Sequence, residues 1–110
     1  SGRVVALAVT GAKRSAALPD VPTVSETPAL KGYEASNWYG LMAPAGTPKP
    51  VIDRLQKDLT AVLNNSSVRD QLASQGIESA PSTAEEFTNY IRSETVKWSK
   101  VIRAANLKAN

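Results

Sequence analysis

Hydrophobic and polar residues follow two different patterns along this chain, and the change comes near residue 47. Residues 4–10 are apolar at almost every position, which is typical of a strand buried on both faces of a sheet. Residues 34–43 form a second strand candidate that ends at Pro44, and residues 77–80 form a short third one. Beyond residue 47 apolar residues recur every three or four positions, which instead predicts helices. The expected fold class is therefore α/β, with strands early and three helices late.

The segment between the first two strand candidates is expected to be a surface loop followed by one helical turn. Residues 11–22 contain two prolines and several charged residues, which is typical of such a loop. Thr23 can cap a turn because Glu26 follows it three residues later. Pro28 is expected to end that turn.

The first long helix is expected to have Thr47 as its N-cap and Pro48 at its first position, where the missing N–H costs nothing. Its apolar stripe consists of Val51, Ile52, Leu55, Leu59, Val62 and Leu63. Ion pairs at the i, i+4 spacing are expected on its solvent side, between Asp53 and Lys57 and between Arg54 and Asp58.

Asn64 and Asn65 are expected to end this helix. Ser67 is the expected N-cap of a second, short helix, with Asp70 three residues later. Gly76 is expected to close it, because glycine adopts the left-handed conformation that commonly follows a helix.

The last helix gives the strongest periodic signal in the chain. A capping box formed by Ser82 and Glu85 predicts its start. Its apolar face extends over about five turns and consists of Phe87, Tyr90, Ile91, Trp98, Val101, Ile102 and Ala105. The cations of this segment are better explained by the helix dipole and a solvated face than by a nucleic-acid or membrane surface; they are Arg92, Lys97, Lys100, Arg103 and Lys108.

Composition removes most enzyme chemistries. The 110 residues include no cysteine and no histidine, so thiol nucleophiles, thiolate metal sites and histidine bases are absent. No glycine-rich phosphate loop follows the first strand candidate. Glu85 is explained by helix capping, and Glu94 is better explained by pairing with Lys97 than by acid–base catalysis. We therefore expect no enzymatic activity, no catalytic residue, no bound metal and no cofactor.

Charge and hydropathy argue against a nucleic-acid partner and against a membrane-spanning helix. Hydrophobic residues make up 42% of the chain and charged residues 21%, which is a globular composition. The net charge is only +3, and the cations are spread among carboxylates, so no nucleic-acid partner is expected. No apolar run reaches the roughly 20 residues that a membrane-spanning helix needs.

One segment is unusual for a plain core strand. Residues 36–40 (SNWYG) combine two hydrogen-bonding side chains, two amphipathic aromatic residues and a glycine. Glycine inside a strand often marks the close approach of another backbone or of a ligand. Trp38 can therefore belong to a core, or line a ligand cleft or a crossover between domains.

Several motifs occur together and in a specific order: residues 2–10 (GRVVALAVT), 13–15 (KRS), 18–24 (LPDVPTV), 32–34 (GYE), 38–40 (WYG) and 43–48 (APAGTP). With the closing pattern of residues 86–106, they resemble the periplasmic solute-binding proteins of tripartite tricarboxylate transporters, the Bug family. The resemblance covers essentially all 110 residues.

The resemblance implies that the chain is the C-terminal part of a longer protein with a two-domain periplasmic binding protein (type II-like) fold. Residues 1–36 would then be the end of domain two, a strand and a loop. Residues 37–46 would be the crossover strand and its turn. Residues 47–110 would be the helical part that completes domain one.

The resemblance also implies a function. Such proteins capture a small carboxylate in the periplasm (a di- or tricarboxylate, an acidic amino acid or an aromatic acid) and deliver it to the membrane permease subunits of the transporter. Backbone amides, hydroxyls and water hold the carboxylate in this family, rather than a dedicated arginine. Thr10, at the end of the first strand candidate, and Asn37 with Trp38, at the crossover, are the expected ligand-binding residues.

Two alternatives stay open at this point: a free-standing helical interaction module that uses the last helix, and the effector-binding half of a transcription regulator. The isolated 110 residues are also expected to self-associate, because the first strand candidate would have open edges.

Overall fold

The computed structural model describes residues 4–108. The chain divides into two compact units, Ser1–Met42 and Ala43–Asn110. In the described part of the chain, no helix combines the length and the apolar character needed to cross a membrane.

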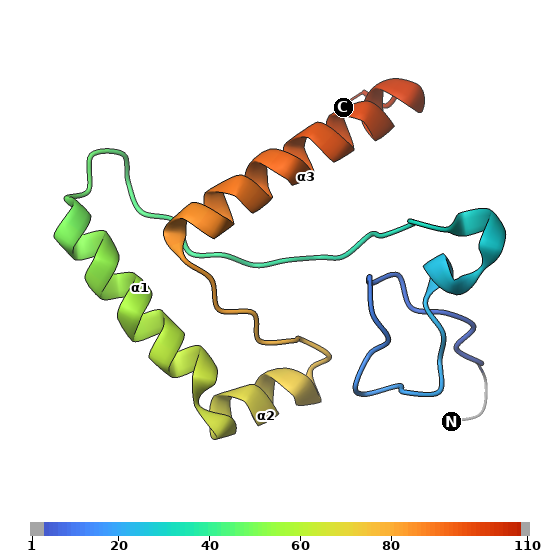
Figure 1. The fold of residues 1–110 in the computed structure, drawn as a ribbon, viewed down its shortest axis with the longest axis horizontal. Coiled ribbons are helices and arrows are strands. Elements are labelled where there is room, and N and C mark those ends of the chain that lie inside the picture. The colour runs from blue at the N-terminus through green and yellow to red at the C-terminus, as the bar shows by residue number, and fades with distance from the viewer. Residues whose placement is uncertain (1–3, 109–110) are drawn as a thin grey trace. The chain divides into compact units, whose positions relative to one another are not determined.

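The first unit is built from loops and two short 3-10 helices, η1 (Val24–Glu26) and η2 (Pro28–Leu30) (Figure 1). The turn expected at residues 23–26 is confirmed: the backbone N–H of Thr23 donates to the Glu26 carboxylate at 2.9 Å. The turn ends before Pro28 as expected: η1 stops at Glu26, and Thr27 is extended, as is typical of a residue before proline. Pro28 then begins a separate 3-10 helix. It occupies the first position of η2, where its fixed φ suits a helical turn and its missing N–H is not needed.

The strand expected over residues 4–10 is wrong, apart from one isolated parallel bridge between Val9 and Thr23. Residues 34–43 and 77–80 are also not strands. A strand needs a neighbour that satisfies its backbone N–H and C=O groups, and a bridge at a single position does not build a ladder. The side chains of Val4, Val5 and Leu7 are more than 80% exposed as a result.

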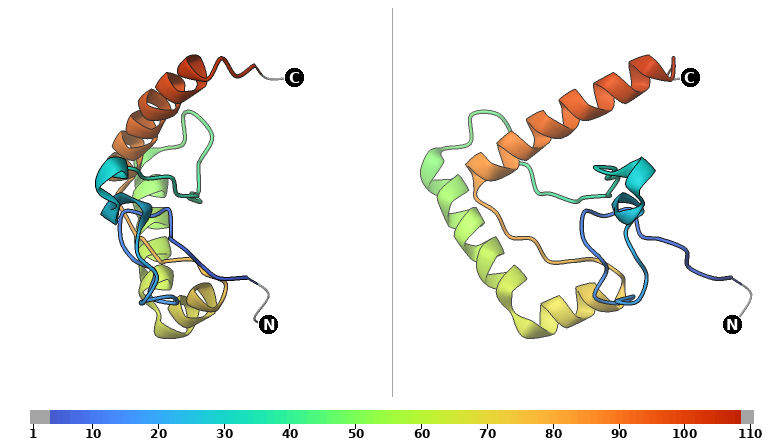
Figure 2. Two further views of the ribbon diagram at one scale, coloured as in Figure 1. Left: turned by 90° about the vertical axis from the view of Figure 1, so that its right-hand side faces the viewer. Right: turned by 45° about the vertical axis from the view of Figure 1, so that its right-hand side comes forward.

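The second unit holds the three helices expected late in the chain, and these are confirmed as α1 (Lys49–Asn64), α2 (Ser66–Ser74) and α3 (Ala84–Ala104). Figure 2 shows them from two further directions. The chain that leaves α2 runs back beside α1, where the Ser79 hydroxyl donates to the Leu63 carbonyl at 2.8 Å.

The apolar stripe of α1 is half-buried along one edge and exposed to solvent along the other. Ile52, Leu59 and Leu63 are half-buried, whereas Val51, Leu55 and Val62 are 46%, 56% and 51% exposed. In the described residues no hydrophobic side chain is fully buried. The second unit therefore has amphipathic helices whose apolar faces are only partly covered.

The start of α1 differs from the sequence-based expectation. Pro48 is the N-cap, and Thr47 lies one residue outside the helix. The Thr47 hydroxyl donates to the Pro44 carbonyl at 2.8 Å, so it closes the preceding turn. A second proline, Pro50, lies in the first turn of the helix, where a missing N–H is tolerated.

The N-cap of α2 is Asn65, not Ser67. The Asn65 side chain accepts hydrogen bonds from the backbone N–H groups of Ser67 at 3.0 Å and Val68 at 3.4 Å. Asn65 has an extended backbone directly after α1, so one residue ends the first helix and begins the second. Gly76 closes α2 as expected, with a φ of +74°.

The capping box of α3 lies one residue later than expected and pairs Thr83 with Glu86. The backbone N–H of Glu86 donates to the Thr83 hydroxyl at 3.1 Å, and the Thr83 N–H donates to the Glu86 carboxylate at 2.8 Å. Because Ser82 and Glu85 have the same spacing, the sequence alone fits both positions of the box.

One of the two ion pairs expected on α1 is confirmed and one is wrong. The Arg54 Nε atom lies 2.7 Å from the Asp58 carboxylate. Asp53 pairs with Lys49 at 2.7 Å instead of with Lys57. Both partners of Asp53 satisfy the i, i+4 spacing, so the pattern does not distinguish them.

Candidate functional site

The three expected ligand-binding residues all lie in the first unit. Thr10 directly follows the Val9–Thr23 bridge, and its side chain is exposed. The backbone N–H of Ala35 donates to the Thr10 carbonyl at 2.9 Å. Asn37 and Trp38 follow that hydrogen bond by two and three residues; Asn37 is exposed and Trp38 is 37% exposed.

Ser36 lies close to Gly11 beside this hydrogen bond. A Cβ placed on Gly11 would lie 3.8 Å from the Ser36 hydroxyl and 3.4 Å from the Lys13 carbonyl, which are ordinary contact distances. The segments around Thr10 and Ala35 therefore lie side by side. They present a hydroxyl and an amide, two neutral groups that can donate hydrogen bonds to a carboxylate oxygen.

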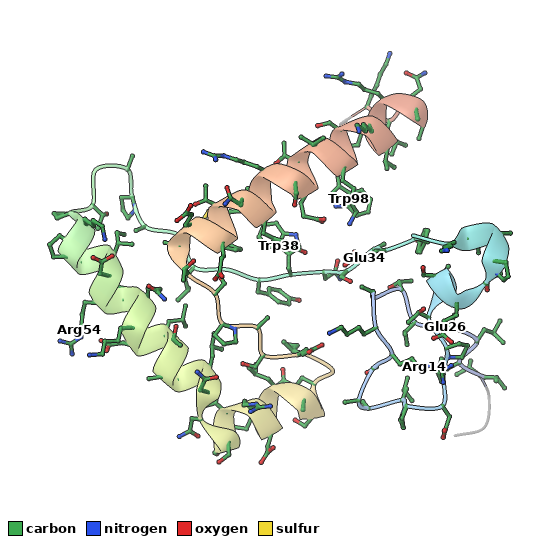
Figure 3. The ribbon with its side chains drawn as sticks, in the orientation of Figure 1. Arg14, Glu26, Glu34, Trp38, Arg54 and Trp98 are labelled. Atoms are coloured by element: carbon green, nitrogen blue, oxygen red, sulfur yellow. The ribbon has the colours of Figure 1, made fainter. Side chains whose placement is uncertain are left out.

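Sequence reasoning missed a network next to these segments. The Arg14 guanidinium makes a bidentate ion pair with the Glu26 carboxylate: Nε donates to Oε1 at 2.9 Å and Nη2 donates to Oε2 at 2.6 Å (Figure 3). Its Nη1 also donates to the Pro19 carbonyl at 3.3 Å. The two residues are 12 positions apart, one in a loop and the other at the end of η1, and no spacing rule predicts such a pair.

Because of these contacts, the pKa of Glu26 falls from 4.5 to about 2. The hydrogen bond from Arg14 has the largest effect, followed by the backbone hydrogen bond from Thr23. Glu26 in turn raises the pKa of Arg14. The positive charge of Arg14 is thus already balanced, and the hydrogen-bonding groups offered by Thr10 and Asn37 are neutral.

A carbon-13 NMR titration of the Glu26 carboxyl is expected to give a pKa of about 2. A folded-state pKa below the unfolded value means that the ionised pair stabilises the fold above pH 4.5 and that this contribution is lost as the pH falls from 4.5 toward 2. Glu86 shifts in the same direction through its hydrogen bonds with Thr83. Arg14→Gln is expected to return only the Glu26 value toward 4.5, and an unchanged value in this variant would contradict the assigned cause.

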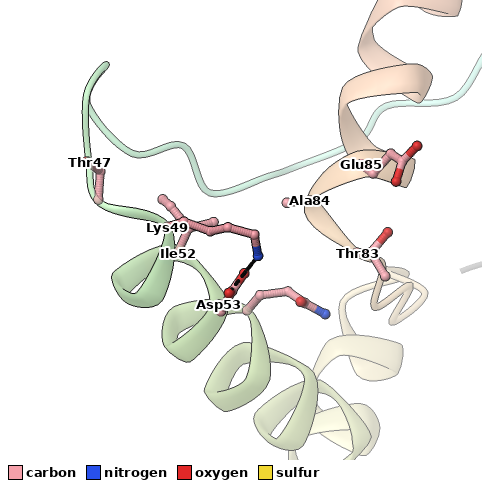
Figure 4. A pocket seen from close by; sticks show the side chains of 8 residues that line it. Thr47, Lys49, Ile52, Asp53, Thr83, Ala84 and Glu85 are labelled. Carbon is pink, nitrogen blue, oxygen red and sulfur yellow. Dashed lines mark hydrogen bonds and ion pairs between the residues drawn. The ribbon is translucent and has the colours of Figure 1, made fainter.

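The second unit contains an open pocket between the start of α1 and the start of α3 (Figure 4). Its lining includes one cation, Lys49, and two carboxylates, Asp53 and Glu85. Lys49 already contacts both Asp53 oxygens, at 2.7 and 2.8 Å. The excess of negative groups makes this pocket a poor place for an anionic ligand.

Glu94 is the one charged residue that is buried among residues 4–108, with 7% exposure. Its carboxylate accepts hydrogen bonds from Lys97 Nζ and from the indole N–H of Trp98, both at 2.8 Å. The expected pairing with Lys97 is confirmed. The Lys97 ammonium group also lies 5.5 Å from the centre of the Trp98 ring. Glu94, Lys97 and Trp98 therefore form one cluster of side chains on α3.

A metal site would need several oxygen, nitrogen or sulfur ligands close together. Over the described range, residues 4–108, no group of three or more His, Cys, Asp or Glu residues could hold a metal ion.

Comparison with known proteins identifies the family. Residues 1–107 match the family described as "Tripartite tricarboxylate transporter family receptor". The chain is 38% identical over 108 residues to a UPF0065 protein from the tcbD-tcbE intergenic region of Pseudomonas sp., covering 98% of this chain and 32% of that protein. It is 34% identical to a UPF0065 protein of Bordetella bronchiseptica, again over 98% of this chain and 32% of the relative. It is 32% identical to Protein BugT of Bordetella pertussis, over 98% of this chain and 33% of the relative.

The chain thus spans about a third of the length of the curated relatives that it matches. The match extends over almost all of its residues, and the resemblance noted from the motifs is confirmed. The chain belongs to the tripartite tricarboxylate transporter receptor family.

Proposed function

We propose that this chain is part of a periplasmic solute-binding protein that captures a small carboxylate and delivers it to the membrane permease subunits of a tripartite tricarboxylate transporter. The observation that carries the proposal is the match of residues 1–107 to the receptor family of such transporters. The ligand is a di- or tricarboxylate, an acidic amino acid or an aromatic acid. Binding closes a cleft between two domains, and the closed form docks on the permease.

The chain forms the C-terminal portion of this two-domain protein. Residues 1–36 end domain two, residues 37–46 cross over, and residues 47–110 complete domain one. This division is supported by the length of the relatives, which are about three times as long as the matched region. Exposed apolar side chains in extended segments give further support, because a larger protein would cover them: Val5 is 82%, Tyr39 80% and Leu41 75% exposed.

The carboxylate is held by Thr10, Asn37 and Trp38. Thr10 and Asn37 supply neutral hydrogen bonds, and Trp38 supplies an apolar aromatic surface. Support comes from the hydrogen bond that joins the Thr10 and Ala35 backbones, two residues before Asn37. The involvement of Arg14 with Glu26 agrees with recognition by neutral groups rather than by a salt bridge.

Tryptophan fluorescence of the full-length receptor, titrated with succinate, citrate, glutamate and benzoate, tests this assignment. The acid that binds is expected to change the emission of the wild type, and Trp38→Phe is expected to remove most of that change. Trp98→Phe is the matched control, because Trp98 hydrogen-bonds with Glu94 within α3. A signal that persists in Trp38→Phe and vanishes in Trp98→Phe would contradict the site.

A further inference from the structure

The backbone around Thr10 is held by few hydrogen bonds. Since no strand forms among the described residues, Thr10 does not belong to a ladder. Three backbone hydrogen bonds, each 2.9 Å long, define its surroundings: Val9 N–H to Pro22, Val24 N–H to Val9, and Ala35 N–H to Thr10. Two of the three join residue 9 to the short stretch at residues 22–24. The position of Thr10 therefore depends on the interactions that fix residues 22–24.

The stretch at residues 22–24 is held from one side by Glu26. The Glu26 carboxylate accepts the backbone N–H of Thr23, and Thr23 is 5% exposed, the most buried residue of the first unit that the structure describes. A backbone donor buried to this degree is costly to leave without a partner. Glu26 is thus tied to the residue that pairs with Val9 in the bridge.

Arg14 holds Glu26 from the other side. Its guanidinium joins the Glu26 carboxylate to the Pro19 carbonyl, so one side chain connects both the middle and the end of the loop that leaves Thr10. Such a connection needs a planar fork with several donors, which arginine has and lysine lacks. The paired side chains are about half exposed, 47% and 44%, so the effect on local structure is expected to be moderate.

We propose that Arg14 and Glu26 are positioning residues of the ligand site: their two-armed ion pair holds residues 22–24 in place, and through the Val9 bridge it holds Thr10 beside Ala35. The inference rests on the proposed function only where it calls Thr10 a ligand-binding residue. Neither Arg14 nor Glu26 touches the ligand. Both act through the backbone that carries the Thr10 hydroxyl.

Amide hydrogen exchange followed by NMR on the ligand-free full-length receptor tests the clamp, meaning the hold of the Arg14–Glu26 pair on residues 22–24. In Arg14→Gln and in Glu26→Gln, exchange at the amides of Val9, Val24 and Ala35 is expected to accelerate about fivefold, because local opening becomes easier. Arg14→Lys is expected to fall between these variants and the wild type. Arg54→Gln is the matched control, since it breaks an exposed arginine–carboxylate pair on α1 and is expected to leave the three amides unchanged.

A double-mutant cycle in the full-length receptor, with citrate as the probe, tests whether Arg14 acts through Thr10. Arg14→Gln is expected to weaken citrate binding about three- to tenfold in the wild-type background and to have little further effect in a Thr10→Val background. Equal losses in both backgrounds would overturn the positioning role, and unchanged exchange at the three amides would overturn the clamp. If no variant binds citrate or another acid while exchange accelerates as expected, the clamp stands and the proposed function fails.

Discussion

Replacing Glu94 by alanine is expected to lower the free energy of unfolding by about 2 kcal/mol, the largest loss for any single polar side chain of α3. The carboxylate is buried and accepts hydrogen bonds from Lys97 and Trp98. Removing it leaves the indole N–H of Trp98 without this acceptor and the ammonium group of Lys97 without this counter-charge. Urea denaturation followed by circular dichroism measures the loss, and Trp98 emission should change with it.

Glu94→Gln is the matched variant. It keeps an acceptor for the Trp98 indole but removes the charge that faces Lys97, so a loss of about 1 kcal/mol is expected. Glu85→Ala, in the exposed first turn of the same helix, is expected to cost less than either. Equal stability of Glu94→Ala and wild type would contradict the view that this carboxylate holds the two side chains together.

The isolated 110-residue chain is expected to self-associate, and analytical ultracentrifugation should detect species larger than the monomer. Val51, Leu55 and Val62 lie within about 40° of one another around α1 at 100° per residue, and each is about half exposed or more. Apolar strips of this kind on a soluble chain promote association unless something covers them. In the proposed receptor, the remaining two thirds of the protein would cover this strip.

The matched pair Leu55→Lys and Ala61→Lys isolates the contribution of the strip, because each variant adds one positive charge to α1. Leu55 lies in the exposed apolar strip, whereas Ala61 lies about 120° from Leu55 around the helix, on the side that carries Arg54. Leu55→Lys is expected to shift the equilibrium toward monomer, by roughly tenfold in the association constant. An equal effect of both variants, or a wild-type chain that is monomeric at high concentration, would contradict this prediction.

The helices could be predicted because each has an amphipathic pattern whose period does not depend on distant residues. Their first residues were harder, since neighbouring residues offered equivalent caps: Ser82 and Thr83 each have a glutamate three positions later. At the start of α2, Asn65 and not Ser67 is the N-cap, because Asn65 lies where the first helix has to end. Local propensity therefore located the helices but not their exact ends.

The strands were predicted wrongly and the Arg14–Glu26 pair was not predicted, both because they depend on contacts between distant residues. A buried strand is stabilised by its neighbours, and residues 4–10 find a single bridge to Thr23 within the described chain. The Arg14–Glu26 pair joins a loop residue to the last residue of η1, and the distance between them depends on the path of the chain from one to the other, which no periodic pattern encodes. Thr10, Asn37 and Trp38 were expected to bind ligand only through the family resemblance, and neither the Thr10–Ala35 hydrogen bond nor the groups around it could be predicted from the sequence.

The most direct measurement of the central claim is calorimetric titration of the full-length receptor with succinate, citrate, glutamate and benzoate, each paired with the corresponding uncharged amide. At least one acid is expected to bind with a dissociation constant on the order of micromolar, and its amide is expected to bind at least about tenfold more weakly, because the proposed site is selective for a carboxylate. Thr10→Val and Asn37→Ala are expected to weaken binding of the acid, whereas Arg54→Gln is expected to leave it unchanged. Binding of none of the acids, or equal binding of an acid and its amide, would contradict the claim that this family member captures a carboxylate.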